Sequence, residues 1–223
     1  MSYKRQFIEF MVVSGVLTFG DFVTKSGRKT PYFINTGNYR SGAQAAKLGE
    51  YYAACIQENI KGEVDALFGP AYKGIPLSVA CAIALSQKHG RNVNYCFNRK
   101  EAKDHGEGGS MVGYQLKSGD RVVIIEDVIT AGTAMRECLP ILKAAADIEI
   151  VGLVVSADRM ERGKGELSAI QEIKAEYDIN TYPIVTVREI IETLHNQPVD
   201  GRIVVDDAVR EKMEAYLQKY GIR

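Results

Sequence analysis

The chain has 223 residues, of which 46% are hydrophobic and 25% charged, values that are ordinary for a globular protein with a substantial core. Its 28 basic and 28 acidic residues cancel, so no global field attracts nucleic acid or an anionic membrane surface. No stretch approaches the ~18 apolar residues of a membrane span, and the N-terminal residues lack the small-residue cleavage pattern of a signal peptide. We therefore expect a cytoplasmic protein without nucleic-acid or membrane partners, in which any anion site is built locally.

The cysteines are widely spaced within apolar segments and form no C-x-x-C pair. They are Cys55, Cys81, Cys96 and Cys138. Buried reduced thiols are therefore expected, rather than disulfides or a zinc site.

Hydrophobic periodicity predicts the elements in chain order. The first part should contain a helix over 3–14, strands at 16–22 and 31–35 around a turn, and a helix from about 45 to 62. Alternating elements should follow, with strands at 66–68, 94–97, 122–125 and 148–156 and helices at 75–87 and 134–146. A helix near 167–177, a strand at 182–185 and two further helices complete the pattern. Strands separated by helices indicate an α/β fold with a parallel sheet core flanked by helices.

The stretch 122–134, VVIIEDVITAGTA, carries the clearest functional signal. Its apolar run predicts a strand buried on both faces, and Glu126 and Asp127 follow at the strand end, where ligands of open α/β sheets bind. Small residues and two threonines then open a helix, whose free N–H groups and dipole suit a phosphate. The stretch lacks the Lys of a P-loop and the glycine spacing of a dinucleotide fingerprint. Ribose 5-phosphate would satisfy both the acidic pair and the helix start, although the small residues alone also describe an ordinary helix cap.

Two further segments carry candidate phosphate donors. The turn FGPAYKG, from Phe68 to Gly74, places glycines on both sides of Lys73, which permits close backbone approach to a ligand; an ordinary turn with a solvated lysine is the alternative. From Asn98 to Ser110 almost no residue is apolar, so 98–112 is expected to be a mobile surface loop. Basic residues on this loop could close over a phosphate, although its acidic residues also fit a solvated loop.

Taken together, five segments resemble the orotate phosphoribosyltransferase family, in that family's order. They are KSGRKTPYFINTG from Lys25, FGPAYKGIP from Phe68, CFNRKEAKDHGEGG from Cys96, the stretch from Val122, and SADRMERGKGELSAIQE from Ser156. The resemblance spans the chain from Lys25 to about Glu172, and the pattern R-K-x-x-K-D-H-G separates this family from purine phosphoribosyltransferases. It implies a type I phosphoribosyltransferase fold, with an N-terminal helix and hood segment at 1–40 and a core at 41–223 that carries the catalytic loop 98–112.

The resemblance also implies an activity. In this family the phosphoribosyl group of 5-phospho-α-D-ribosyl 1-diphosphate passes to orotate, giving orotidine 5′-phosphate and diphosphate in UMP biosynthesis. Mg²⁺ is the implied cofactor, carried mainly by the diphosphate, so no residue is assigned as its ligand. A homodimer with shared active sites is the implied assembly.

Residue roles follow from the resemblance, position by position. The implied catalytic residues are Lys103, Asp127, Arg99, Lys100 and His105. The diphosphate donor should contact these five together with Lys25, Tyr72, Lys73, Glu126, Val128, Ile129, Thr130, Ala131, Gly132, Thr133 and Ala134. Lys25 and Lys100 are implied to reach the neighbouring subunit's site or to lie beside it. Orotate should contact Phe33, Ile34, Thr130 and Arg159.

Two positions depart from the family pattern. Glu126 stands where relatives often have Asp, which lengthens the side chain by about one methylene, and Ile34 stands where many relatives have an aromatic residue, which removes stacking. Two other functions stay open on the sequence: transfer to a different base, and a non-catalytic regulator that senses the phosphoribosyl donor.

Overall fold

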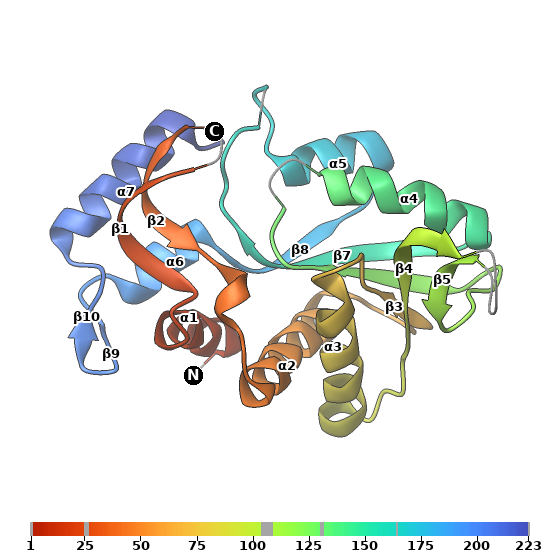
Figure 1. Cartoon of the computed structure of the whole chain (residues 1–223). Helices are drawn as coiled ribbons and strands as arrows, with labels where there is room; N and C mark the ends of the chain where they lie inside the picture. Colours follow the sequence, from red (N-terminus) through yellow and green to blue (C-terminus); the bar gives the residue numbers. More distant parts are fainter. Residues whose placement is uncertain (1, 25–26, 104–108, 130–131, 164, 223) are drawn as a thin grey trace.

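The computed structural model describes residues 2–24, 27–103, 109–129, 132–163 and 165–222. Its centre is a six-stranded sheet in the order β5-β4-β3-β6-β7-β8 (Figure 1). Five of these strands run parallel, and β5 pairs antiparallel with β4 at one edge. The strands are β3 (Ala66–Phe68), β4 (Asn94–Lys103), β5 (Gly109–Gly113), β6 (Arg121–Glu126), β7 (Glu149–Asp158) and β8 (Thr181–Thr186).

Helices cover both faces of the sheet. Helices α2 (Gly42–Asn59) and α3 (Gly74–His89) lie on one face, and α4 (Thr133–Ala145) and α5 (Ala169–Tyr177) lie on the other (Figure 1). Alternate residues of β6 enter separate apolar clusters, Val123 and Ile125 on the α2 side and Val122 and Ile124 on the α4 side. This explains the unbroken β-branched run in the sequence, because a parallel strand covered on both faces has no polar side.

A smaller unit stands beside the sheet and is built from both ends of the chain. We call this whole unit the hood; it is larger than the segment 1–40 expected from the sequence, because it also includes residues 187–220. Helix α1 (Tyr3–Val13), the antiparallel hairpin β1 (Leu17–Val23) and β2 (Lys29–Ile34), and the short helix η1 (Thr36–Asn38) come from the first forty residues. Helix α6 (Val187–Leu194), the small hairpin β9 (Pro198–Val199) and β10 (Arg202–Ile203), and α7 (Asp207–Tyr220) come from the last forty. Helix α7 packs on β2, with the rings of Tyr32 and Tyr216 edge to face at 6.0 Å.

The predicted helices and parallel strands are confirmed, with boundaries that differ by a few residues. The expectation that 98–112 lacks regular structure is wrong for its two flanks, because β4 continues to Lys103 and β5 returns from Gly109. Main-chain hydrogen bonds make this ladder, so it does not require the apolar side chains on which the prediction relied. Residues 104–108, including His105, lie outside the described residues.

All four cysteines are free and buried, as predicted. Within the described ranges, no helix is long and apolar enough to cross a membrane.

Candidate active site

The acidic pair lies where β6 ends, between the ends of its neighbours β3 and β7. Glu126 is only 9% exposed, and its Oε1 accepts a hydrogen bond from the backbone N–H of Asp127 at 2.9 Å. Asp127 repeats the pattern, since its Oδ1 accepts from the N–H of Val128 at 2.7 Å. Each carboxylate is therefore oriented by the main chain of the next residue before any ligand arrives.

Two hydroxyl groups from other elements hold the backbone of this pair. Tyr52 of α2 donates to the carbonyl oxygen of Glu126 at 2.7 Å, and Ser156 of β7 donates to the carbonyl oxygen of Asp127 at 2.6 Å. Sequence reasoning missed both, although Ser156 begins one of the five matched segments. Nothing in the local pattern around Tyr52 marks it as more than a core residue.

Burial and hydrogen bonding move the two carboxyl groups in opposite directions. Burial raises the pKa of Glu126 to about 7, with the charge of Asp127 adding to the effect. Burial alone would raise the pKa of Asp127 too, but hydrogen bonds from Lys73, from the Val128 N–H and from Thr36 outweigh it and hold that pKa below its usual value. Near neutral pH the pair therefore contains one firmly ionised carboxylate and one group that exchanges its proton.

Lys73 joins the second predicted segment to the acidic pair. Its ammonium donates to Oδ2 of Asp127 at 2.7 Å and to the hydroxyl of Thr36 at 3.0 Å, while Thr36 itself donates to the same Oδ2 at 2.8 Å. The Asp127 side chain is 15% exposed and that of Lys73 is 62% exposed. The cation is thus paired but remains open to a ligand from solvent.

The turn that carries Lys73 requires glycine at Gly69 and Gly74, because the backbone packs too closely there for a Cβ atom. A Cβ on Gly69 would stand 2.1 Å from the carbonyl oxygen of Gly74, and one on Gly74 would stand 2.9 Å from that of Ile125. These glycines therefore let the turn close on itself and on β6, a role different from the ligand approach predicted for them. The peptide bond between Ala71 and Tyr72 is cis.

The same turn contacts β4, on which three of the implied catalytic residues lie, Arg99, Lys100 and Lys103. The N–H of Ala71 donates to Oδ1 of Asn98 at 2.9 Å, and the Lys100 ammonium stands 5.6 Å from the ring centroid of Tyr72, which is 70% exposed. A cavity of about 150 Å³ is bounded by this turn, by β4 and by the start of α4; its lining includes Arg99, Lys100 and Ala134. Three of the segments singled out in the sequence thus meet at one place.

The start of α4 has the features that a phosphate site needs. Gly132 is the N-cap residue with φ +65°, a conformation that side-chain-bearing residues rarely adopt, and no side chain caps the first turn among the described residues. Thr133 and Ala134 form that turn, so their N–H groups have no intrahelical partner. Thr130 and Ala131 lie outside the described residues.

Arg159, the implied orotate contact, follows β7 and packs against the hood. Its Nε donates to Oε1 of Glu161 at 2.9 Å, and its guanidinium stands 4.6 Å from the ring centroid of Tyr32, whose hydroxyl donates to the same oxygen at 3.0 Å. The buried Nη2 lies 2.7 Å from Oε1 of Glu161 but outside hydrogen-bond geometry, so within the described ranges its N–H groups have no acceptor. Glu161 was overlooked in the sequence although it lies within a matched segment.

The remaining implied residues are distributed as follows. Phe33 and Ile34 end β2, with Phe33 37% exposed and Ile34 packed against the core. Val128 and Ile129 connect the acidic pair to α4. The backbone of Lys103 ends β4, and its side chain, like Lys25 and His105, lies outside the description.

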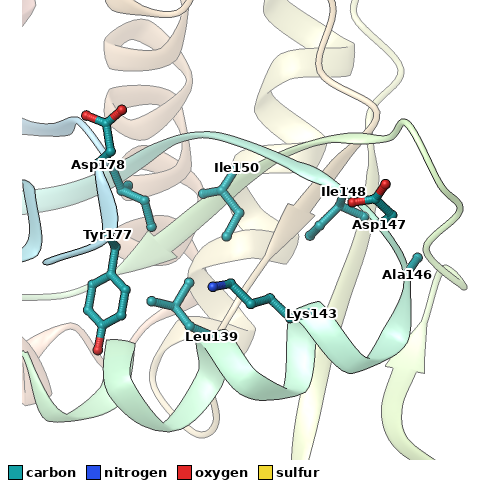
Figure 2. A pocket seen from close by; sticks show the side chains of 9 residues that line it. Leu139, Lys143, Ala146, Asp147, Ile148, Ile150, Tyr177 and Asp178 are labelled. Carbon is teal, nitrogen blue, oxygen red and sulfur yellow. The ribbon is translucent and has the colours of Figure 1, made fainter.

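A cavity of about 530 Å³ lies at a distance from these residues. It is formed by the second half of α4, the beginning of β7 and the end of α5, with Leu139, Lys143, Ile150 and Tyr177 among its lining residues (Figure 2). This cavity lies at the amino ends of the strands, where β7 begins. The acidic pair lies at their carboxyl ends, where the parallel strand β6 ends. None of the implied site residues lines this cavity.

Comparison with known proteins identifies the family of the chain. The family model described as the phosphoribosyl transferase domain matches residues 35–197. A protein of Lachnoclostridium phytofermentans named orotate phosphoribosyltransferase is 56% identical over 220 residues, covering 99% of this chain and 98% of its own length. One of Clostridium beijerinckii with the same name is 54% identical over 222 residues, covering 100% and 99%.

A solved structure extends the agreement to three dimensions. The crystal structure of orotate phosphoribosyltransferase from Francisella tularensis superposes with a TM-score of 0.83 at 39% identity, covering 97% of this chain and 99% of that one. The matches run the length of both partners and include all the segments that build the site. This chain belongs to the orotate phosphoribosyltransferase family, within the type I phosphoribosyltransferases.

Proposed function

We propose that the protein transfers the phosphoribosyl group of 5-phospho-α-D-ribosyl 1-diphosphate to orotate, giving orotidine 5′-phosphate and diphosphate as a step of UMP biosynthesis. The observation that carries the proposal is the meeting of an acidic pair, the Lys73 cation and the start of α4, which no described side chain caps, at adjacent strand ends. These groups suit the hydroxyls, the diphosphate and the 5-phosphate of one donor molecule.

In the proposed reaction a bond forms between N1 of orotate and C1 of the ribose while the bond from C1 to the diphosphate oxygen breaks. The proton lost from N1 is taken up by the released diphosphate. The ribose becomes oxocarbenium-like, and the leaving diphosphate gains negative charge. Lys73 and the basic residues Arg99, Lys100, Lys103 and His105 stabilise that charge, an effect typically worth about 2.7–4 kcal/mol for one well-placed donor. Glu126 and Asp127 bind the ribose hydroxyls from the other side, and the segment 98–112 closes over the donor to exclude water.

Orotate is proposed to bind between the hood and the end of β7. The buried Nη2 of Arg159, which is ion-paired with Glu161 but makes no hydrogen bond within the described residues, offers its N–H groups to the orotate carboxylate. A guanidinium fork suits a carboxylate better than an ammonium does. The main chain of Phe33 and Ile34 and the hydroxyl of Thr130 complete the proposed base contacts. Since Ile34 is aliphatic, we expect no ring stacking there.

Mg²⁺ is the proposed cofactor, and the acidic pair fits it. In the described part of the chain no three metal-binding side chains gather, whereas Mg²⁺ commonly uses substrate phosphates beside one or two carboxylates. The ion would bind together with the diphosphate, and the acidic pair would lie beside it. No residue is assigned as a ligand of the ion. It would supply positive charge to the leaving group.

We further propose a homodimer with shared active sites, and a cytoplasmic location, for which the four free cysteines are supporting evidence. A direct assay tests the activity: purified protein, the phosphoribosyl donor and Mg²⁺ are mixed with orotate, hypoxanthine or uracil, and absorbance is followed. We expect loss of orotate alone, and reversal on adding diphosphate to orotidine 5′-phosphate. Consumption of another base would identify a different transferase, and binding of the donor without consumption of any base would identify a regulator.

A further inference from the structure

Thr36 occupies a position that joins the two halves of the proposed site. It begins η1, two residues after the end of β2, so it belongs to the same segment as the proposed orotate contacts Phe33 and Ile34. Its hydroxyl donates to Oδ2 of Asp127, which is 91 residues away at the end of β6. A single hydrogen bond of 2.8 Å therefore connects the base side of the site to the ribose side.

The hydroxyl of Thr36 is fixed in direction by its two partners. Its one hydrogen points at Asp127, and its lone pair accepts from the Lys73 ammonium at 3.0 Å. The other oxygen of Asp127 accepts from the Val128 N–H. The Asp127 carboxylate is thus held on one oxygen by main chain and on the other by two side chains, of which Thr36 is the neutral one.

Lys73 and Thr36, the two hydrogen-bond donors to Oδ2 of Asp127, respond differently when the phosphoribosyl substrate binds. Lys73 is exposed, and a diphosphate competes for its ammonium because that ligand carries more negative charge than one carboxylate. Thr36 has no charge to attract the diphosphate, so its bond to Asp127 persists after Lys73 has turned to the ligand. A carboxylate kept in one rotamer loses less conformational entropy when it binds the ribose hydroxyls.

We infer that Thr36 is a positioning residue for phosphoribosyl transfer, which holds the Asp127 carboxylate ready for the ribose while Lys73 passes to the diphosphate. This inference rests on the proposed function. Removal of the hydroxyl should weaken binding of the phosphoribosyl donor about tenfold, the effect expected for one hydrogen bond to a charged group.

The test uses three variants of the full-length protein. Thr36→Val keeps the shape and removes the hydroxyl, Thr36→Ser keeps the hydroxyl, and Thr18→Val makes the same change at an exposed position of the neighbouring strand β1. Calorimetry with the phosphoribosyl donor and Mg²⁺ should give a dissociation constant about tenfold higher for Thr36→Val and values near wild type for the other two. In a double variant with Asp127→Ala, Thr36→Val should add less than twofold, because its effect passes through Asp127.

A second readout does not depend on activity. Carboxyl NMR of the ligand-free protein should show a higher pKa for Asp127 in Thr36→Val than in wild type, restored in Thr36→Ser. An unchanged donor affinity in Thr36→Val, a Ser variant as impaired as the Val variant, or full additivity with Asp127→Ala would each overturn the inference. Wild-type protein that consumes no orotate would count against the proposed function alone, since the Asp127 titration still reports on Thr36.

Discussion

The Lys73 ammonium and the Asp127 carboxylate form an ion pair of 2.7 Å that joins the β3–α3 turn to the end of β6. Each partner has a different proposed contact in the donor complex, the diphosphate for Lys73 and the ribose for Asp127. The pair therefore has to be exchanged for two ligand contacts during binding. Its exposed cation makes that exchange possible at low cost, because exposed ion pairs contribute little to stability.

Replacement of Lys73 tests this exchange. Lys73→Ala should weaken donor binding by about 10- to 100-fold, since a charge-assisted contact to the diphosphate is lost, and should leave the melting temperature close to wild type because the side chain is 62% exposed. Calorimetry and thermal unfolding give the two values. Lys88→Ala, at the other end of the same helix, is the matched control and should bind normally. Equal affinities for the two variants would remove Lys73 from the diphosphate site.

The raised pKa of Glu126 predicts a pH dependence of stability. Between its usual value of 4.5 and about 7 the folded protein holds a proton that the unfolded chain has lost, so the contribution of this group to the free energy of unfolding falls as pH rises through that window. The full effect is on the order of 3 kcal/mol. Glu126→Gln should therefore lose less stability than wild type between pH 5 and pH 7 in denaturant titrations. Glu63→Gln, at an exposed position, should show the same dependence of the free energy of unfolding on pH as wild type. The same dependence in Glu126→Gln would refute the raised pKa of Glu126.

Gly132 provides a test of the phosphate cradle. Gly132→Val should abolish measurable donor binding, because φ +65° is strained for a β-branched residue and the start of α4 would shift. Gly42→Val is the control, since this residue also stands at a helix start but has no positive φ and no atom within 4 Å of an added Cβ. Normal donor affinity in Gly132→Val would show that the helix start does not bind the phosphate.

Lys103 should matter for turnover more than for folding. Lys103→Ala is expected to lower kcat by on the order of 10²–10³, the loss expected when one stabiliser of transition-state charge is removed. The orotate assay and the melting temperature are measured together, with Lys117→Ala, beyond β5, as the control. Turnover within twofold of wild type would show that the charged segment is only solvated.

Shared active sites can be tested by mixing two inactive variants, Lys100→Ala and Asp127→Asn. If Lys100 serves the neighbouring subunit, half of the dimers after statistical exchange are mixed and each has one intact site, so roughly one quarter of wild-type activity should return. In one chain the Lys100 ammonium stands 5.6 Å from the Tyr72 ring, which also allows a role within its own subunit. Absence of recovery despite proven exchange would favour that second role.

Local pattern was enough to predict most of the fold and the position of the acidic pair. The β-branched run before Glu126 and the periodicity of α2 to α4 depend on burial that repeats along the sequence, so they are visible without tertiary structure. The strands on either side of 104–108 were not predictable in this way, since main-chain pairing leaves no apolar pattern in a polar edge hairpin. Thr36 and Tyr52 could not be found either, because they act on residues 91 and 74 positions away along the chain. Glu161 acts through the arrangement of Arg159 with Tyr32, which only the folded chain creates.

The packing of α7 on β2 has a consequence for the order in which the protein is made. The strand that carries Phe33 and Ile34 is translated early, but Tyr216, against which Tyr32 packs, emerges more than 180 residues later. Contacts of such long sequence separation form slowly, and domains assemble as the chain leaves the ribosome. The parallel sheet, which carries the acidic pair, can therefore fold before the hood folds. The base-binding side should be the last part of the site to mature during synthesis.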